Sequence, residues 1–296
     1  MAALAIASVY NEYIHGSDYV QVGPRTWWRN LRRGFEYDQN KFDTNHFYHP
    51  WNGALFYSAG RSSGLGFWGS SSVALAGSFL WECCGETLPM SLNDMVSTSL
   101  GGVAMGEMTH RLGSALLDNR DTGATRVLRE VGVLAVDTVR GVNRAFSGEQ
   151  RRAPNPEDPF EWRPRRLGAL ASLGSRRVGN EGELGGEGAK TAPFVDLWVA
   201  YGSVFDNERR RPYDSFWMQA QVNFTDDVDP AGLMTIRGDV LSRPLGPPGA
   251  RNGAIALVQH FDYVNQRTWE FGAQSLALGL SRRLRISPRA RVEMHA

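Results

Sequence analysis

Acidic side chains and a histidine recur at helical spacing inside an otherwise apolar stretch between residues 45 and 112. Glu82 and Glu86 are four residues apart, and Glu107 and His110 are three apart, so each pair would share a helix face. Two antiparallel helices would then gather three carboxylates and an imidazole, which are ligands for zinc, manganese or iron. Di-iron bundles use two Glu-x-x-His pairs, and this stretch has one. The spacing therefore gives a first hypothesis, a metal site of Glu82, Glu86, Glu107 and His110.

The same stretch carries groups suited to hydrolysis of a lipid ester or phosphate. His49 and Glu82 would activate a water molecule, and Asp94 would orient the imidazole ring. Arg61 or Arg111 would bind the phosphate. No Gly-x-Ser-x-Gly motif lies in a strand–turn–helix context, which disfavours a serine nucleophile. The second hypothesis is therefore a catalytic group of His49, Glu82, Asp94 and Arg61.

A third hypothesis, which the sequence favours over the metal site, is structural. An ionised side chain inside an apolar bundle is costly unless an opposite charge or hydrogen bonds compensate it. In this hypothesis arginines neutralise the carboxylates, while amide and hydroxyl groups complete the hydrogen bonds. The predicted polar network consists of Asn45, Arg61, Glu82, Glu86, Asn93, Asp94, Thr98, Glu107 and Arg111.

Helices at 50–62, 70–86, 91–117 and 126–146 are predicted to position these residues. Ser91 is expected to cap the third of these helices, with Asp94 at its third position. Gly101 and Gly102 fall inside the same helix and cost about 1 kcal/mol each relative to alanine. Their presence predicts that another backbone approaches closely there.

From residue 192 onward, the apolar residues alternate with polar ones at a period of two. Strands are predicted at 166–178, 194–201, 216–224, 233–241, 254–263, 269–280 and 289–295. Long antiparallel strands with one apolar and one polar face are typical of a membrane barrel, although a β-sandwich gives a similar pattern. The last strand does not close an obvious barrel, so we expect a small barrel or a chain that is incomplete at its C-terminus.

Composition excludes some classes of function. The net charge of +1 gives no field that would attract nucleic acid. The 33 glycines and nine tryptophans suit a membrane-embedded protein or a glycine-rich β protein. No stretch reaches the roughly 18 uncharged apolar residues of a simple membrane-spanning helix.

The only cysteines, Cys83 and Cys84, are neighbours and are not expected to bridge each other.

Together these patterns predict an α+β protein. A helical domain at 1–146, with a polar interior centred on 45–112, would precede a linker at 147–192 that includes the candidate first strand. An antiparallel sheet at 193–296 would follow, barrel-like or part of a barrel.

The stretch between residues 45 and 112, with the segment just before it, resembles the bacterial family called domain of unknown function 3943. The matching residues are Gly34-Phe35-Glu36-Tyr37-Asp38, Asn45, His49-Pro50, Gly53, Arg61, Gly64, Ser70, Gly77-Ser78, Trp81-Glu82, Glu86, Pro89, Ser91, Asn93-Asp94, Thr98, Gly102, Gly106-Glu107 and Arg111. Members are often described as candidate outer-membrane proteins, and no activity is assigned to the family. This chain departs from the family in lacking a clear signal peptide and the final strands.

The resemblance implies an envelope protein in the outer membrane or at its periplasmic face, with membrane lipid as a partner. In the leading hypothesis it is structural, and the helical unit plugs or buttresses the sheet. The alternative is a membrane-associated hydrolase of lipid esters or phosphates, with or without a metal ion. The sequence identifies no cofactor and no protein partner.

Overall fold

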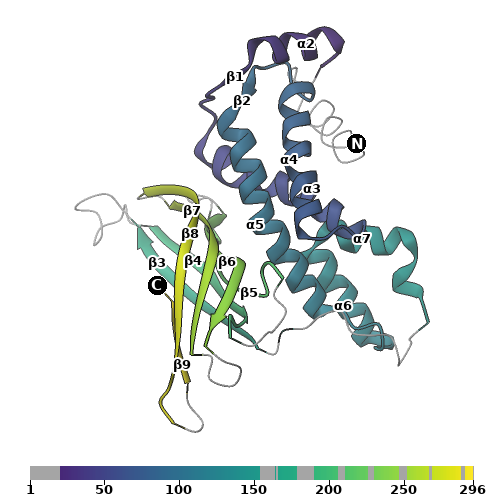
Figure 1. Ribbon diagram of the computed structural model, residues 1–296. Helices are drawn as coiled ribbons and strands as arrows, with labels where there is room; N and C mark the ends of the chain where they lie inside the picture. The colour runs from purple at the N-terminus through teal and green to yellow at the C-terminus, as the bar shows by residue number, and fades with distance from the viewer. Residues whose placement is uncertain are drawn as a thin grey trace. The chain divides into compact units, whose positions relative to one another are not determined.

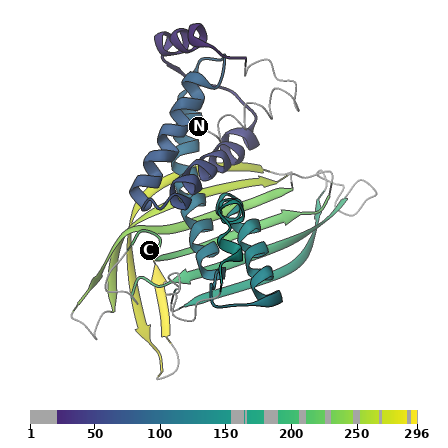
Figure 2. The same ribbon diagram turned by 90° about the vertical axis from the view of Figure 1, so that its right-hand side faces the viewer.

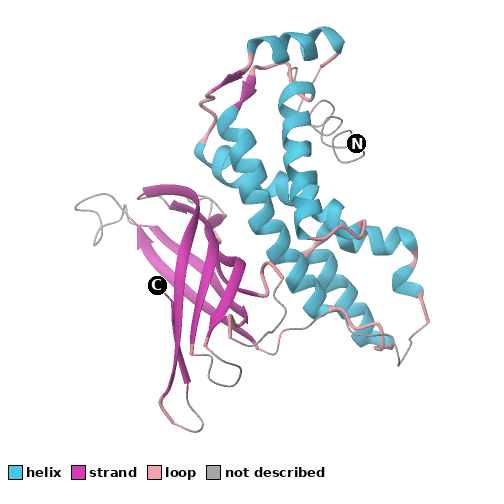
Figure 3. Ribbon diagram, in the orientation of Figure 1, coloured by secondary structure: helices cyan, strands magenta, loops and turns pink. Residues whose placement is uncertain are grey.

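A computed structural model of the chain is shown in Figure 1. It describes residues 21–153, 164, 166–178, 190–205, 211–225, 230–246, 252–266, 269–287 and 291–295. Residues 1–16, for which the sequence predicts a short helix ending at Gly16, lie outside the described residues. The chain divides into two compact units, Met1–Arg163 and Pro164–Ala296. The first is helical and the second is a sheet (Figure 3), which confirms the α+β class. The predicted first strand belongs to the sheet unit.

The helical unit is built around three long helices that carry the polar residues singled out above. Its elements are α2 (Pro24–Arg33), a π-helical turn η2 (Thr44–Tyr48), α3 (His49–Ser62), α4 (Phe67–Cys84), α5 (Leu92–Leu116), α6 (Gly123–Val136), α7 (Thr138–Ser147) and a short 3-10 turn η3 (Glu149–Arg151). Two short strands, β1 (Phe35–Glu36) and β2 (Met90–Ser91), pair in parallel. None of the described helices combines the length and the hydropathy that crossing a bilayer requires.

Helices α3 and α5 touch backbone to backbone at two glycines. A Cβ atom added to Gly53 would lie 1.8 Å from the carbonyl oxygen of Thr98, and one added to Gly102 would lie 2.4 Å from the carbonyl carbon of Gly53. The close approach predicted at Gly102 is therefore confirmed. Further along, Tyr57 packs on Gly106, so successive residues of α3 meet successive residues of α5. The two helices run in the same direction, and α4 connects them.

The single helix predicted at 126–146 is wrong, because the structure has two helices there. The carboxylate of Asp137 accepts a hydrogen bond from the backbone N–H of Arg140 and caps α7 just after α6 ends. Gly141 then lets α7 pack against α6, since a Cβ at this position would lie 2.5 Å from the Cα of Leu134.

The expectation for Cys83 and Cys84 is also wrong. The structure joins their sulfurs in a disulfide between neighbouring residues at the end of α4.

The sheet unit is a single antiparallel sheet with strands in the order of the sequence, and it forms a half-barrel (Figure 2). The strands are β3 (Leu167–Val178), β4 (Lys190–Gly202), β5 (Ser215–Asn223), β6 (Ala231–Leu245), β7 (Gly253–Gln266), β8 (Trp269–Arg285) and β9 (Arg291–His295). Each corresponds to a predicted strand, and β6 and β8 extend further than predicted. In the described part of the sheet, β3 and β9 are the edges.

Residues paired directly across strands share a face, so the register separates the two faces of the sheet. One row across β4–β7 reads Trp198, Gln219, Thr235 and Asp262. The neighbouring row reads Val199, Met218, Ile236 and Phe261. We call these the polar face and the apolar face.

Hydrogen bonds run across the polar face. Gln219 donates to Asp196 at 3.0 Å, and Arg237 donates to Asp262 at 2.7 Å. The apolar face has its most buried side chains, such as Ile236 and Tyr263, on the central strands.

Candidate functional site

His49, Glu82 and Asp94 come together inside the helical unit, and we call them the carboxylate–imidazole cluster. One ligand atom from each lies within 4.8 Å of the others. Three elements position them: His49 begins α3, Glu82 lies in the last turn of α4, and Asp94 lies in the first turn of α5. Because α3 and α5 run in the same direction, their first turns lie at the same end of the unit. The antiparallel α4 brings its last turn to that end.

Each member of the cluster is held by a hydrogen bond from outside it. His49 Nδ1 lies 3.2 Å from Thr98 Oγ1, while His49 Nε2 lies 3.4 Å from Asp94 Oδ2. Glu82 Oε2 accepts a hydrogen bond of 2.8 Å from the backbone N–H of Ser91. The hydroxyl of Ser91 in turn accepts from the backbone N–H of Asp94 at 3.2 Å, which confirms the predicted cap.

A second layer of polar groups surrounds Asp94. Asn93 Nδ2 donates to Asp94 Oδ1 at 3.1 Å, and Asn40 Nδ2 lies 3.5 Å from Asp94 Oδ2. The backbone N–H of Asp38 donates to Asn93 Oδ1 at 3.0 Å. The segment before α3 is thereby held against the start of α5.

Burial and mutual repulsion disfavour the charged forms of this cluster. Burial raises the pKa of the Glu82 carboxyl to about 8, and the nearby Glu86 and Asp94 add to the rise. Burial, followed by the charge of Asp38, raises the pKa of Asp94 to about 6. Burial lowers the pKa of His49 to about 4, so its ring is neutral at pH 7. Among the residues that the structure describes, no arginine or lysine forms an ion pair with Glu82, Glu86 or Asp94.

Glu107 forms a second cluster with three partners, which we call the glutamate–arginine cluster. Arg111 Nε donates to Glu107 Oε1 at 2.7 Å, and Arg61 Nε lies 3.0 Å from Glu107 Oε2. The hydroxyl of Tyr57 donates to Glu107 Oε2 at 2.6 Å. Glu107 is completely buried. Burial, reinforced by the charge of Glu107, raises the pKa of Tyr57 and keeps it protonated as a donor.

The structure does not gather the four residues of the metal hypothesis. Glu86 lies beyond the end of α4, and its carboxylate accepts a hydrogen bond from the indole N–H of Trp81. His110 Nδ1 lies 3.6 Å from Asp137 Oδ2, and Glu107 belongs to the glutamate–arginine cluster. Glu82 lies beside Asp94 in the first turn of α5, whereas Glu107 lies 13 residues, or about 20 Å, further along that helix.

Three of the four residues of the catalytic hypothesis do come together, as the carboxylate–imidazole cluster. The fourth, Arg61, lies 12 residues after His49 on α3, a rise of about 18 Å. It cannot share a site with His49 while both belong to one straight helix.

The predicted polar network is split between the two clusters. Arg61 and Arg111 both pair with Glu107, and neither pairs with Glu82 or Glu86. Asn45 accepts a hydrogen bond from Ser97 through its backbone carbonyl oxygen, whereas its side-chain Oδ1 is buried without a partner.

Sequence reasoning missed the roles of Asp38, Tyr57 and Asp137. Tyr57 had a local signal, because it precedes Arg61 by four residues and so shares its helix face. Asp38 reaches Asn93, next to the carboxylate–imidazole cluster, and Asp137 reaches His110, only through the tertiary fold.

The helical unit with a polar interior, followed by an open antiparallel sheet, defines a two-unit α+β protein. Residues 34–139, which make up most of the helical unit, match the family model described as "Domain of unknown function (DUF3943)", as the resemblance in the sequence predicted. The matched segment contains both clusters. No curated protein and no solved structure matches the chain.

Proposed function

We propose that this protein is an envelope protein that associates with membrane lipid through the apolar face of its sheet, and that its helical unit is structural. The observation that supports this most strongly is a set of exposed apolar side chains on strands β6–β9. We call this set the leucine strip: Leu241, Ile255, Leu276, Leu278, Leu280, Leu284, Val292 and Met294. Its members are between 39% and 78% exposed.

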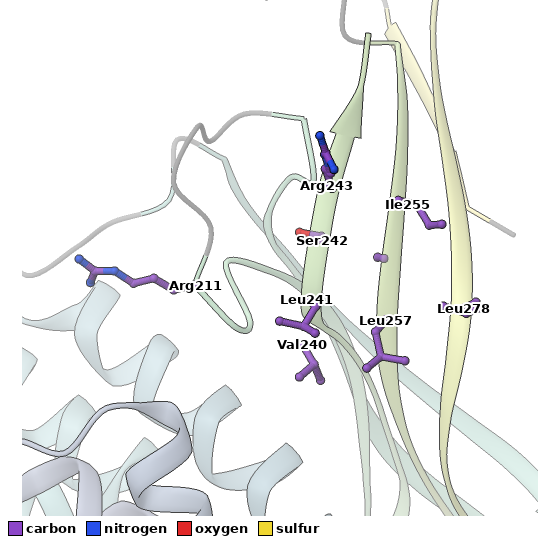
Figure 4. A pocket seen from close by; sticks show the side chains of 9 residues that line it. Arg211, Val240, Leu241, Ser242, Arg243, Ile255, Leu257 and Leu278 are labelled. Carbon is purple, nitrogen blue, oxygen red and sulfur yellow. The ribbon is translucent and has the colours of Figure 1, made fainter.

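The register places the leucine strip on the apolar face. Leu241 pairs with Leu257, and Leu257 pairs with Leu278. These three side chains line a groove of about 320 Å³ (Figure 4). A contiguous apolar surface of this kind indicates contact with a membrane or another apolar partner. Alternation of apolar and polar residues along every strand is what a lipid-facing sheet requires.

Arginines lie at one end of the leucine strip. Arg243 pairs with Ile255, and it lines the same groove (Figure 4). Arg282 pairs with Met294. Guanidinium groups beside an apolar surface suit lipid phosphates at the edge of a bilayer. Because two-faced antiparallel sheets are characteristic of outer-membrane proteins, we extend the proposal to the outer membrane or its periplasmic face. The plug or buttress role of the helical unit stays a prediction.

Vesicle flotation tests this proposal with two variants of one strand. We expect Leu278→Glu to lower the partition of the full-length protein into phosphatidylethanolamine–phosphatidylglycerol vesicles by about tenfold or more, since burying a leucine contributes about 1.5–3 kcal/mol. The control is Ser275→Glu, which places the same charge on the polar face of β8 and should bind as the wild type does. Equal loss in both variants, or in neither, would contradict lipid contact through the apolar face.

Hydrolysis of a lipid ester or phosphate is a second candidate function, favoured by the convergence of His49, Glu82 and Asp94. A neutral imidazole between two carboxylates is able to accept a proton from water. The test is hydrolysis of bis(p-nitrophenyl) phosphate and p-nitrophenyl butyrate by the purified protein. Activity that Glu82→Gln removes and Glu107→Gln retains would support it, and absence of turnover with both substrates would count against it.

A further inference from the structure

We propose that the carboxylate–imidazole cluster binds one divalent transition-metal ion, with His49 Nε2, Glu82 and Asp94 as its protein ligands. This site differs from the set that the spacing of the sequence suggested, and it does not depend on lipid binding. The donor set, one imidazole nitrogen and two carboxylates, suits Mn²⁺, Fe²⁺ or Zn²⁺.

The donor atoms are close enough to share an ion after a small contraction. They lie within 4.8 Å of one another. Ligand atoms bound at about 2.1 Å in a tetrahedral site are roughly 3.4 Å apart. His49 Nε2 and Asp94 Oδ2 already lie 3.4 Å apart. The Glu82 carboxylate, which lies within 4.8 Å of the other two donors, would have to approach them by up to roughly 1.4 Å.

Hydrogen bonds from outside the cluster orient the ligands as they do in known metal sites. A metal-bound histidine usually uses its other ring nitrogen to donate a hydrogen bond, which fixes the tautomer. His49 Nδ1 lies 3.2 Å from Thr98 Oγ1, so this arrangement is available. Asn93 and the backbone N–H of Ser91 hold the two carboxylates in the same way, at 3.1 and 2.8 Å.

An independent observation points to a missing positive charge. Glu82 is 3% exposed, and among the described residues its only hydrogen bond is the one from Ser91 to Oε2. Its second oxygen, Oε1, accepts no hydrogen bond from these residues and keeps some contact with solvent. Glu107 is buried to the same degree, yet it is bound by Arg61, Arg111 and Tyr57. The ionised form of a carboxyl group with so little access to water and no cation beside it is disfavoured, and a bound metal ion would supply the missing positive charge.

Protons are the competitor for this site. Without a metal, the raised pKa of Glu82, about 8, means that this carboxyl group holds a proton at neutral pH. A metal ion would displace that proton. The experiment must therefore measure the ion itself and not stability alone.

The experiment uses the purified full chain, stripped with EDTA and titrated with Mn²⁺ and Zn²⁺ by calorimetry. We expect about one ion per chain, with affinity at least ~100-fold lower in Glu82→Gln and Asp94→Asn and roughly 10- to 100-fold lower in Thr98→Ala. The matched control is Glu86→Gln, which removes a neighbouring carboxylate whose pKa is also raised but which lies outside the ligand group. Its affinity should equal that of the wild type.

Pulsed EPR of Mn²⁺ in the wild type provides a readout that does not depend on any Glu82 variant folding. Coupling to one histidine nitrogen is expected, and His49→Gln should remove it. The proposal is overturned if the wild type shows no saturable binding up to about 1 mM. It is also overturned if the nitrogen coupling persists in His49→Gln, or if Glu86→Gln weakens binding as much as Glu82→Gln does.

Discussion

Replacing Glu107 with alanine is expected to lower the free energy of unfolding of the helical unit by about 3–5 kcal/mol. The wild-type carboxylate is bound by Arg61 at 3.0 Å and by Arg111 at 2.7 Å, and it accepts a hydrogen bond from Tyr57. Arg111 is 4% exposed. Removing the carboxylate takes away the negative charge that Arg61 and Arg111 share, in a place where water is scarce. The cost arises from the charges left behind, not from the strength of the original pairs.

Chemical denaturation followed by circular dichroism measures this effect. The control is Glu36→Ala, which breaks an ion pair of 3.4 Å with Arg33 whose side chains are both about half exposed. Exposed pairs contribute between 0 and about 1 kcal/mol, so this variant should unfold almost as the wild type does. If Glu107→Ala were no less stable than Glu36→Ala, the glutamate–arginine cluster would not hold the helical unit together.

Gly102→Ala is expected to cost about 3 kcal/mol or more, although alanine is the better helix former by about 1 kcal/mol. The added methyl group would lie 2.4 Å from a backbone carbon of Gly53, where no side-chain rotation can relieve the overlap. Helices α3 and α5 would have to move apart, and the contacts of both clusters depend on that spacing.

Gly132→Ala in α6 is the matched control. A Cβ at this position would lie 3.4 Å from the flexible end of Leu116, an ordinary contact. This variant should keep or gain stability, by up to about 1 kcal/mol. Comparison of the two melting temperatures isolates the backbone contact, and equal melting temperatures would contradict the close approach of α3 and α5.

Local sequence signals identified the elements of this fold more reliably than they identified its sites. The period-two pattern located strands β4–β9, and Ser91 with Asp94 located the start of α5. The break between α6 and α7 was missed, because Asp137 acts as a cap only when the chain turns there.

The candidate metal set failed for a geometric reason. Spacing of three or four places residues on one helix face only while the helix continues, and α4 ends at Cys84, before Glu86. Glu107 and His110 do share a helix, but they meet different neighbours, Arg61 and Asp137. The pairing of His49 with Asp94 requires knowing that α3 and α5 run in the same direction. Nothing in the local spacing contains that information.

A cysteine scan along β8 tests lipid contact by the apolar face most directly. Single cysteines at positions 275–280 would carry a bimane label, since the two natural cysteines form a disulfide. Reconstitution with brominated phospholipids then reports which labels touch acyl chains. We expect strong quenching at Leu276, Leu278 and Leu280 and weak quenching at the other three positions, 275, 277 and 279, a period of two. Uniform quenching along the strand, or none at any position, would contradict the account.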